Sequence, residues 1–277
     1  MANILSNEQI KFYHNKGFLF PFDLYNPEEA KNFHSLYNKI EEDLGYEPQK
    51  EFRIKAHLPF PWLYDIVNNS RLLDAVEDLI GPNVLCWGAS FFAKAAKDPR
   101  FVSYHTDTFT YGFEPAETCT AWLSFNEAST ESGCINYIPG SHKLNIKHEI
   151  HADNNNLLTQ GQNVIGVDLS EAVSAPLKAG QVVFHHESVV HGSGPNKSEN
   201  PRVGLSIHYC APHVRETRIP ELTALHLRGF DTSGNWRHDP LPRHDYDKKC
   251  IDVMKKTRAL FVKATKEKIN KNKFGAV

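Results

Sequence analysis

The spacing of apolar residues changes along the chain near residue 83. Before that point, apolar positions recur mainly every three or four residues, which is the spacing of amphipathic helices. Beyond it, short apolar and β-branched runs are separated by clusters of Gly, Pro, Asn and Ser, as in strands joined by turns. The runs predict strands at residues 18–20, 84–92, 101–109, 119–125, 134–138, 181–185 and 202–210.

Residues that favour helix ends delimit three helices in the N-terminal part. Ser6 begins a capping-box pattern, and the helix that follows ends near Gly17. Asn26 caps the second helix, and Ser70 is expected to cap the third, which ends at Gly81. The buried stripe of the second helix is predicted to be Ala30, Phe33, Tyr37, Ile40 and Leu44.

Helices followed by many short strands predict a mainly β fold with helical additions and a double-stranded β-helix core, a jelly roll of the cupin kind. We expect residues 1–277 to form a single domain. Within it, residues 1–82 would be a helical N-terminal support, 83–212 the jelly-roll core and 213–277 a C-terminal loop and helix. That last helix, over 248–273, is basic, and we expect it to pack on the core.

Two segments follow neither period. Residues 53–64 are rich in Pro and aromatic residues and are interpreted as an ordered loop of the kind that often lines a site. Residues 153–166 are rich in Asn, Gln and Gly and are interpreted as a mobile surface insertion.

Composition and charge narrow the possible partners to small molecules. Charged residues make up 23% of the chain and the formal net charge is -2, so no global field favours nucleic acid or an anionic membrane. The chain shows neither an export signal nor an apolar run of spanning length, and its five cysteines include no C-x-x-C pair. We therefore expect a cytoplasmic protein with reduced, buried cysteines. No pattern in the sequence indicates an oligomeric state.

The strongest candidate chemistry is a metal site. His105 and Asp107 lie two positions apart in a predicted strand, so both side chains would point to one face. His191, after a later strand and turn, is the preferred third ligand, with His185 and His186 as alternatives. Two His and one carboxylate leave three positions open on an octahedral Fe(II) for a co-substrate and O₂.

Context matters more than spacing for this site. His151 and Asp153 repeat the H-x-D spacing, but they lie in a loop with no strand to orient them. Arg202 opens the next strand after His191, and a guanidinium suits two-pronged capture of a carboxylate. A metal-binding jelly roll without oxygenase activity, such as a cupin-type isomerase or a hydrolase, would not need Arg202 there; a non-catalytic binding module is a further alternative.

Three stretches together carry a family resemblance. They are His105-Thr-Asp107, Ser132-Gly-Cys-Ile-Asn-Tyr-Ile-Pro-Gly-Ser-His142, and His191-Gly-Ser-Gly-Pro-Asn followed by Pro-Arg202. In these motifs the sequence resembles the phytanoyl-CoA dioxygenase family of Fe(II)/2-oxoglutarate-dependent oxygenases. The resemblance implies the cofactors Fe(II), 2-oxoglutarate and O₂.

The same resemblance implies roles for individual residues. His105, Asp107 and His191 would bind iron, and Arg202 would pair with the distal carboxylate of 2-oxoglutarate. Trp122 and Ser193 would help to line the co-substrate site. The reaction expected for such a site is hydroxylation of a substrate C–H bond with release of succinate and CO₂.

A narrower likeness concerns Asp107. Segments such as Gly81-Pro-Asn-Val-Leu-Cys-Trp are similar to those of carrier-protein-dependent aliphatic halogenases, which have Ala or Gly where this chain has Asp107. A carboxylate at that position leaves no coordination site for halide, so hydroxylation is expected.

The substrate is predicted from basic residues that could close over the mouth of the barrel. The favoured substrate is a small zwitterion, 2-aminoethylphosphonate, hydroxylated to its 1-hydroxy product, since the chain is similar to dioxygenases with that activity. A free or carrier-tethered amino acid is the alternative, and fatty acyl-CoA ranks below both. The candidate head-group residues are Arg53, Lys55, His57, His213, Arg215 and Arg218.

Overall fold

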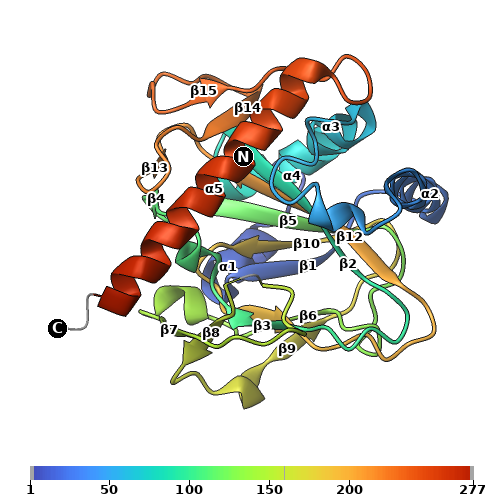
Figure 1. The fold of residues 1–277 in the computed structure, drawn as a ribbon, viewed down its shortest axis with the longest axis vertical. Coiled ribbons are helices and arrows are strands. Elements are labelled where there is room, and N and C mark those ends of the chain that lie inside the picture. Colours follow the sequence, from blue (N-terminus) through green and yellow to red (C-terminus); the bar gives the residue numbers. More distant parts are fainter. Residues whose placement is uncertain (1–2, 159, 275–277) are drawn as a thin grey trace.

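Two β-sheets form the body of the computed structural model, which describes residues 3–158 and 160–274 (Figure 1). The larger sheet has seven strands, in the order β1 (Phe18–Asp23), β10 (Gln181–His186), β5 (Thr118–Ser124), β12 (Arg202–Cys210), β2 (Val84–Lys94), β14 (Thr223–Arg228) and β15 (Arg237–His238). The smaller sheet has the order β3 (Val102–His105), β11 (His191–Ser193), β6 (Ile135–Tyr137) and β9 (Val173–Ala175). The expected strand-rich jelly-roll fold is confirmed.

The side chains of strand β12 alternate between two faces of the large sheet, one toward the hydrophobic core and one toward a cavity. Leu205, Ile207 and Tyr209 point into the main hydrophobic core, whereas Ser206 and His208 line a cavity between the sheets. This alternation is the two-residue period of a strand whose two faces meet different environments. Both neighbours of β12, which are β2 and β5, pair with it along most of its length.

Four helices pack on the core face of the large sheet: α1 (Asn7–Lys16), α2 (Pro27–Leu44), α3 (Pro61–Val67) and α4 (Ser70–Ile80). The predicted caps of α1 and α2 are confirmed, each as a complete capping box. The cap of α4 is one residue earlier than predicted, because the extended Asn69 accepts a hydrogen bond from the Leu72 amide. Residues 61–64, the end of the segment predicted to be an ordered loop, form the start of helix α3, because Pro61 stands at its first position, where proline is tolerated.

The second half of the chain adds shorter elements around the cavity. Strands β7 (Lys147–Ile150) and β8 (Gln162–Ile165) form a hairpin, so the prediction that 153–166 is a mobile insertion is wrong for residues 162–165. Strands β4 (Phe113–Glu114) and β13 (Arg215–Glu216) form a second small pair. The 3-10 helices are η1 (Pro48–Lys50), η2 (Asp107–Phe109), η3 (Ser141–Lys143) and η4 (Leu169–Glu171).

Helix α5 (Lys248–Phe274) confirms the predicted C-terminal helix and crosses the front of the molecule in Figure 1. Met254 is buried in the main core, and Phe261 packs against a second cluster that contains Trp87. The C-terminal segment thus covers the barrel, as expected from its apolar stripe.

The outer segments also contribute strands to the large sheet. Strand β1 pairs with β10, and β14 pairs with β2, so residues outside 83–212 extend the sheet on both sides.

All five cysteines are buried and unpaired. No helix among the described residues is long and apolar enough to cross a membrane.

Candidate metal centre

The two predicted histidine ligands meet on paired strands of the small sheet. His105 is the last residue of β3, His191 is the first of β11, and the two residues are register partners. Asp107 does not continue β3 as predicted, but begins the 3-10 helix η2. Its amide donates to the carbonyl of Glu187 at 2.9 Å, so a turn rather than strand alternation directs its carboxylate toward the histidines.

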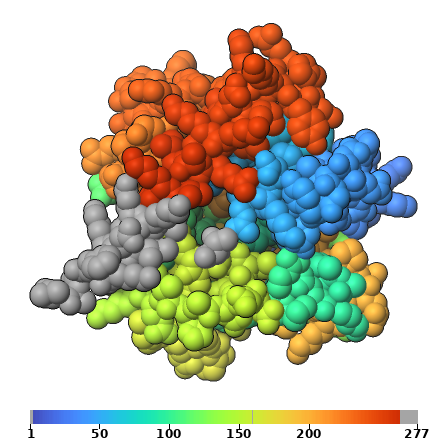
Figure 2. Space-filling model, viewed as in Figure 1, coloured from blue at the N-terminus to red at the C-terminus, as the bar shows by residue number. Residues whose placement is uncertain are grey.

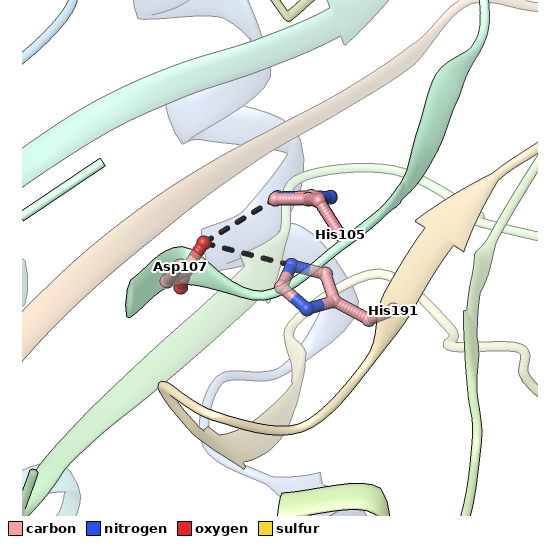
Figure 3. A group of neighbouring side chains, drawn as sticks. All are labelled: His105, Asp107 and His191. Carbon is pink, nitrogen blue, oxygen red and sulfur yellow. Dashed lines mark ion pairs between the residues drawn. The ribbon is translucent and has the colours of Figure 1, made fainter. Parts of the chain in front are cut away.

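The three side chains converge on one point (Figure 3). Oδ1 of Asp107 lies 3.4 Å from Nε2 of His105 and 3.8 Å from Nε2 of His191. One ligand atom from each residue falls within 4.8 Å of the others. Two imidazoles and one carboxylate oxygen in this arrangement form the 2-His-1-carboxylate site of non-haem Fe(II) oxygenases.

Backbone carbonyls orient both imidazole rings. Nδ1 of His105 lies 2.9 Å from the carbonyl oxygen of Ser103, and Nδ1 of His191 lies 3.0 Å from that of Val189. A carbonyl only accepts, so each Nδ1 carries the hydrogen and each Nε2 keeps its lone pair for a metal ion. Both rings are therefore preset as neutral ligands.

The charge state of the site also suits a divalent cation. Burial alone would raise the pKa of the Asp107 carboxyl, but its contacts with His105 and His185 hold that pKa well below its usual range. Burial, followed by the neighbouring His105, lowers the pKa of His191 well below its usual range. An ionised carboxylate beside a neutral imidazole is the protonation state that metal binding requires.

The structure distinguishes His191 from the alternative third ligands, His185 and His186. Nδ1 of His186 accepts a hydrogen bond from the Ser188 amide at 3.0 Å, and its ring packs against His142 rather than the other ligands. His185 does reach the centre, but its Nε2 lies 3.5 Å from Oδ2 of Asp107, whereas His105 and His191 pair with Oδ1. The geometry therefore favours His191 as the third ligand, and no sequence pattern indicated a separate role for His185.

The residues expected to hold 2-oxoglutarate line the same cavity. Arg202 is 1% exposed, and its guanidinium carbon lies 5.1 Å from the ring centre of Trp122. A Cβ at Gly204 would lie 2.1 Å from the Trp122 ring, so only glycine leaves room for the indole across β12. Ser193 lies beside them, and its Oγ accepts a hydrogen bond of 2.7 Å from Lys94.

Lys94 was missed in the sequence because a lysine at the end of a strand is usually exposed. It is fully buried here and pairs in register with Arg202 across β2 and β12. Burial lowers the pKa of Arg202 to about 10, and burial followed by the Arg202 charge lowers the pKa of Lys94 to about 6. Among the described residues, no carboxylate forms an ion pair with either cation, and Nε of Arg202 has no hydrogen-bond partner.

These observations fit an anionic co-substrate. A buried guanidinium without a carboxylate partner is costly unless a ligand supplies the negative charge. A 2-oxo dicarboxylic acid that chelates the metal at one end would bring its distal carboxylate to Arg202 at the other. The residues present therefore fit both Fe(II) and 2-oxoglutarate.

The cavity of about 640 Å³ extends from the metal site to the surface beside α5. Figure 2 shows the surface hollowed between α5 in red and the segment that holds η1 in blue. The walls are largely apolar and aromatic, whereas the outer part carries Lys50, Arg53 and Arg258.

Only one of the six predicted head-group residues, Arg53, lines this cavity. Lys55 is buried against Asp239, and His57 is buried away from the cavity lining. The other three lie on the surface with partners of their own: His213 with Glu117, Arg215 with Glu114 and Arg218 with the Phe109 carbonyl. The sequence missed Lys50 and Arg258 because their place at the cavity depends on η1 and α5.

Comparison with known proteins agrees with the geometry. Human peroxisomal phytanoyl-CoA dioxygenase is 24% identical over 234 residues, which cover 76% of this chain and 69% of that protein. A non-heme monooxygenase, ThoJ in its apo form, has a TM-score of 0.82 and 25% identity, covering 95% of this chain and 99% of that chain. CytC3 with Fe(II) and alpha-ketoglutarate, 20% identical over 89% of this chain and 98% of that chain, shares the fold with a TM-score of 0.64.

The family match covers both the helical N-terminal part and the metal centre. Residues 13–204 match the family described as phytanoyl-CoA dioxygenase (PhyH). The match includes all three converging ligands. A cupin-type isomerase, a hydrolase and a non-catalytic module are thereby set aside. The chain belongs to the phytanoyl-CoA dioxygenase family and is a 2-oxoglutarate-dependent dioxygenase that uses Fe(II).

Proposed function

We propose that this dioxygenase hydroxylates an unactivated C–H bond of a small, anion-bearing substrate. The observation that carries the proposal is the retained Asp107 carboxylate within the converging triad, next to a buried Arg202 that lacks a counter-ion. Fe(II), together with 2-oxoglutarate and O₂, supplies the oxidising chemistry, with release of succinate and CO₂.

The chain's own residues would bind and orient the reactants. Arg202 offers two parallel N–H donors to the distal carboxylate of 2-oxoglutarate, with Trp122 and Ser193 bounding that site. Asp107 takes the metal position that a halide would need, so we expect only hydroxylated product in excess chloride or bromide. A chlorine isotope pattern in the product would overturn this role of Asp107.

Three cations at the mouth of the cavity support an anionic head group. Lys50 pairs with Glu47 and Arg258 pairs with Glu51, whereas Arg53 has no ion pair among the described residues. A phosphonate group could form an ion pair with the unpaired Arg53. We therefore propose 2-aminoethylphosphonate as the first substrate to test.

A second candidate is a free or carrier-tethered amino acid. The cavity of about 640 Å³ is larger than two small acids require, and its inner wall includes Trp87, Phe92 and Tyr111. A longer substrate with an apolar part would fill this space better than a compact zwitterion.

The deciding experiment is succinate formation from 2-oxoglutarate in the presence of aminophosphonates, free amino acids, a carrier-tethered amino acid and an acyl-CoA, with mass spectrometry of the products. Arg53→Met should raise the Michaelis constant for an anionic substrate without changing the Michaelis constant for the co-substrate. Lys255→Met, an exposed cation on α5 outside the cavity lining, is the matched control. Equal turnover of neutral and anionic substrates would contradict the proposal.

The location of the enzyme is also part of the proposal. We infer a reducing compartment such as the cytoplasm, because five buried cysteines remain unpaired. Localisation of the tagged protein, together with thiol titration after denaturation, would test this inference.

A further inference from the structure

His185 is a fourth imidazole at the metal centre, and the established chemistry gives it no role. It lies on β10 and is 3% exposed, and its ring centre is 4.6 Å from that of His191. Its Nε2 has no hydrogen-bond partner among the described residues, yet it lies 3.5 Å from Oδ2 of Asp107. A buried nitrogen donor in this position points to a function in the site.

Tyr137 fixes the orientation of the His185 ring. The hydroxyl of Tyr137 lies 2.9 Å from Nδ1 of His185, and its own ring is fully buried and stacked on Phe18 with centres 4.7 Å apart. A hydroxyl can donate or accept, so Tyr137, unlike the carbonyls beside His105 and His191, allows Nδ1 of His185 to be the acceptor and Nε2 to carry the hydrogen toward Asp107. Nδ1 then keeps a lone pair and accepts the hydroxyl hydrogen of Tyr137.

The two oxygens of Asp107 consequently face different groups. Oδ1 lies 3.4 Å from Nε2 of His105 and 3.8 Å from Nε2 of His191, so it is the oxygen that these two ligands share. Oδ2 faces Nε2 of His185 instead. If both oxygens bound the metal, the carboxylate would occupy one of the three positions that 2-oxoglutarate and O₂ require.

We propose that His185 is a positioning residue that holds Oδ2 of Asp107 away from the metal, so that the carboxylate binds through Oδ1 alone. His185 acts through Asp107 and does not itself coordinate the metal. Tyr137 supports this role because its hydroxyl donates to Nδ1 of His185, which leaves the ring hydrogen on Nε2. This role is independent of which substrate the enzyme takes.

The test measures binding of 2-oxoglutarate to the metal-loaded enzyme without oxygen or substrate, from the visible absorption of the Fe(II) complex. Removal of the imidazole N–H that faces the ligating carboxylate, in His185→Leu, should weaken that binding about 10- to 100-fold. Co(II) should still bind, with an affinity lowered by no more than about 100-fold, and the variant should still unfold cooperatively. His185→Gln, whose amide can place an N–H near the position of Nε2, should restore most of the affinity.

Two further variants separate positioning from packing. His186→Leu is the matched control, because His186 lies on the same strand but outside the centre, and it should bind 2-oxoglutarate like the wild type. Tyr137→Phe should have a smaller effect than His185→Leu, and the double variant should be no worse than His185→Leu alone.

Several outcomes would overturn the proposal. Wild-type 2-oxoglutarate affinity in His185→Leu would show that Asp107 needs no such partner, and loss of Co(II) binding would make His185 a ligand. No recovery in His185→Gln would assign the effect to packing. Because no substrate is present, none of these results depends on the proposed substrate class.

Discussion

Two buried cations of this protein stand in contrasting surroundings. Lys55 donates to Oδ2 of Asp239 at 2.5 Å and to the carbonyl of Thr223 at 2.7 Å, and the Thr223 hydroxyl bonds the other oxygen of Asp239. Arg202 donates only to the carbonyl of Gly133 among the described residues, and its register partner on β2 is Lys94, whose pKa burial lowers to about 6.

The difference distinguishes a structural charge from a charge kept for a ligand. A buried ion whose partners are all protein groups stabilises the fold as a unit, and removing one partner leaves the other uncompensated. A buried cation without a counter-ion costs stability until an anion arrives. Lys55 and Arg202 are both buried cations, and they differ in whether protein groups supply the negative charge.

The largest effect is expected at the metal ligands. His105→Ala, Asp107→Ala and His191→Ala should each abolish succinate formation and metal binding while leaving the unfolding temperature of the metal-free protein nearly unchanged. His151→Ala, which has the same H-x-D spacing in a loop, is the control and should remain fully active. Full activity in His191→Ala would transfer the third ligand to His185 or His186.

The paired cation should show the opposite pattern. Asp239→Ala should lower the free energy of unfolding by about 3–5 kcal/mol, since it leaves the buried Lys55 uncompensated. The Michaelis constant for the co-substrate should not change. Chemical denaturation together with steady-state kinetics measures both quantities, and a raised Michaelis constant with unchanged stability would contradict the comparison.

Arg202 should affect ligand binding but not the stability of the ligand-free protein. Arg202→Lys keeps the charge but loses the two-pronged geometry, so the Michaelis constant for the co-substrate should rise about tenfold or more, from loss of a charged hydrogen bond worth about 1.5–3 kcal/mol. Maximal rate should fall much less. An unchanged Michaelis constant would assign the anchor elsewhere.

The last prediction concerns Lys94, whose effect should be visible as a dependence of stability on pH. Its pKa in the folded protein is about 6, below the ordinary 10.5, so the unfolded chain binds more protons between these values. The cost of burying Lys94 is thus full below pH 6 and disappears as pH rises past 10.5. Lys94→Met should therefore be more stable than the wild type at pH 6 and below, and the difference in free energy of unfolding should shrink as pH rises to 10.5. A difference that does not change with pH would contradict this assignment.

Local sequence was sufficient to point to the residues that carry the chemistry. The H-x-D pair, the distal His and the following Arg indicated the ligands, although Asp107 reaches the site through a turn that strand periodicity does not predict. Capping boxes located α1 and α2 because their signals lie within four residues.

Long-range pairing could not be predicted from the same patterns. Lys55 looked like a substrate-binding residue of an exposed loop, and only the fold brings it to Asp239, far along the chain. The role proposed for His185 likewise depends on Tyr137 on another strand. In both cases the partner determines the function of the side chain, and no local spacing indicates that partner.

The burial of the five cysteines has a consequence for an enzyme that activates oxygen. Thiols are oxidised mainly as thiolates, and burial raises the pKa of Cys86 and Cys119 to about 12 and that of Cys250 to about 11. Cys134, the thiol influenced by Arg202, is also buried with a raised pKa. Burial also raises the pKa of Cys210 well above its usual range, so reactive oxygen released in unproductive cycles would meet no readily ionised thiol.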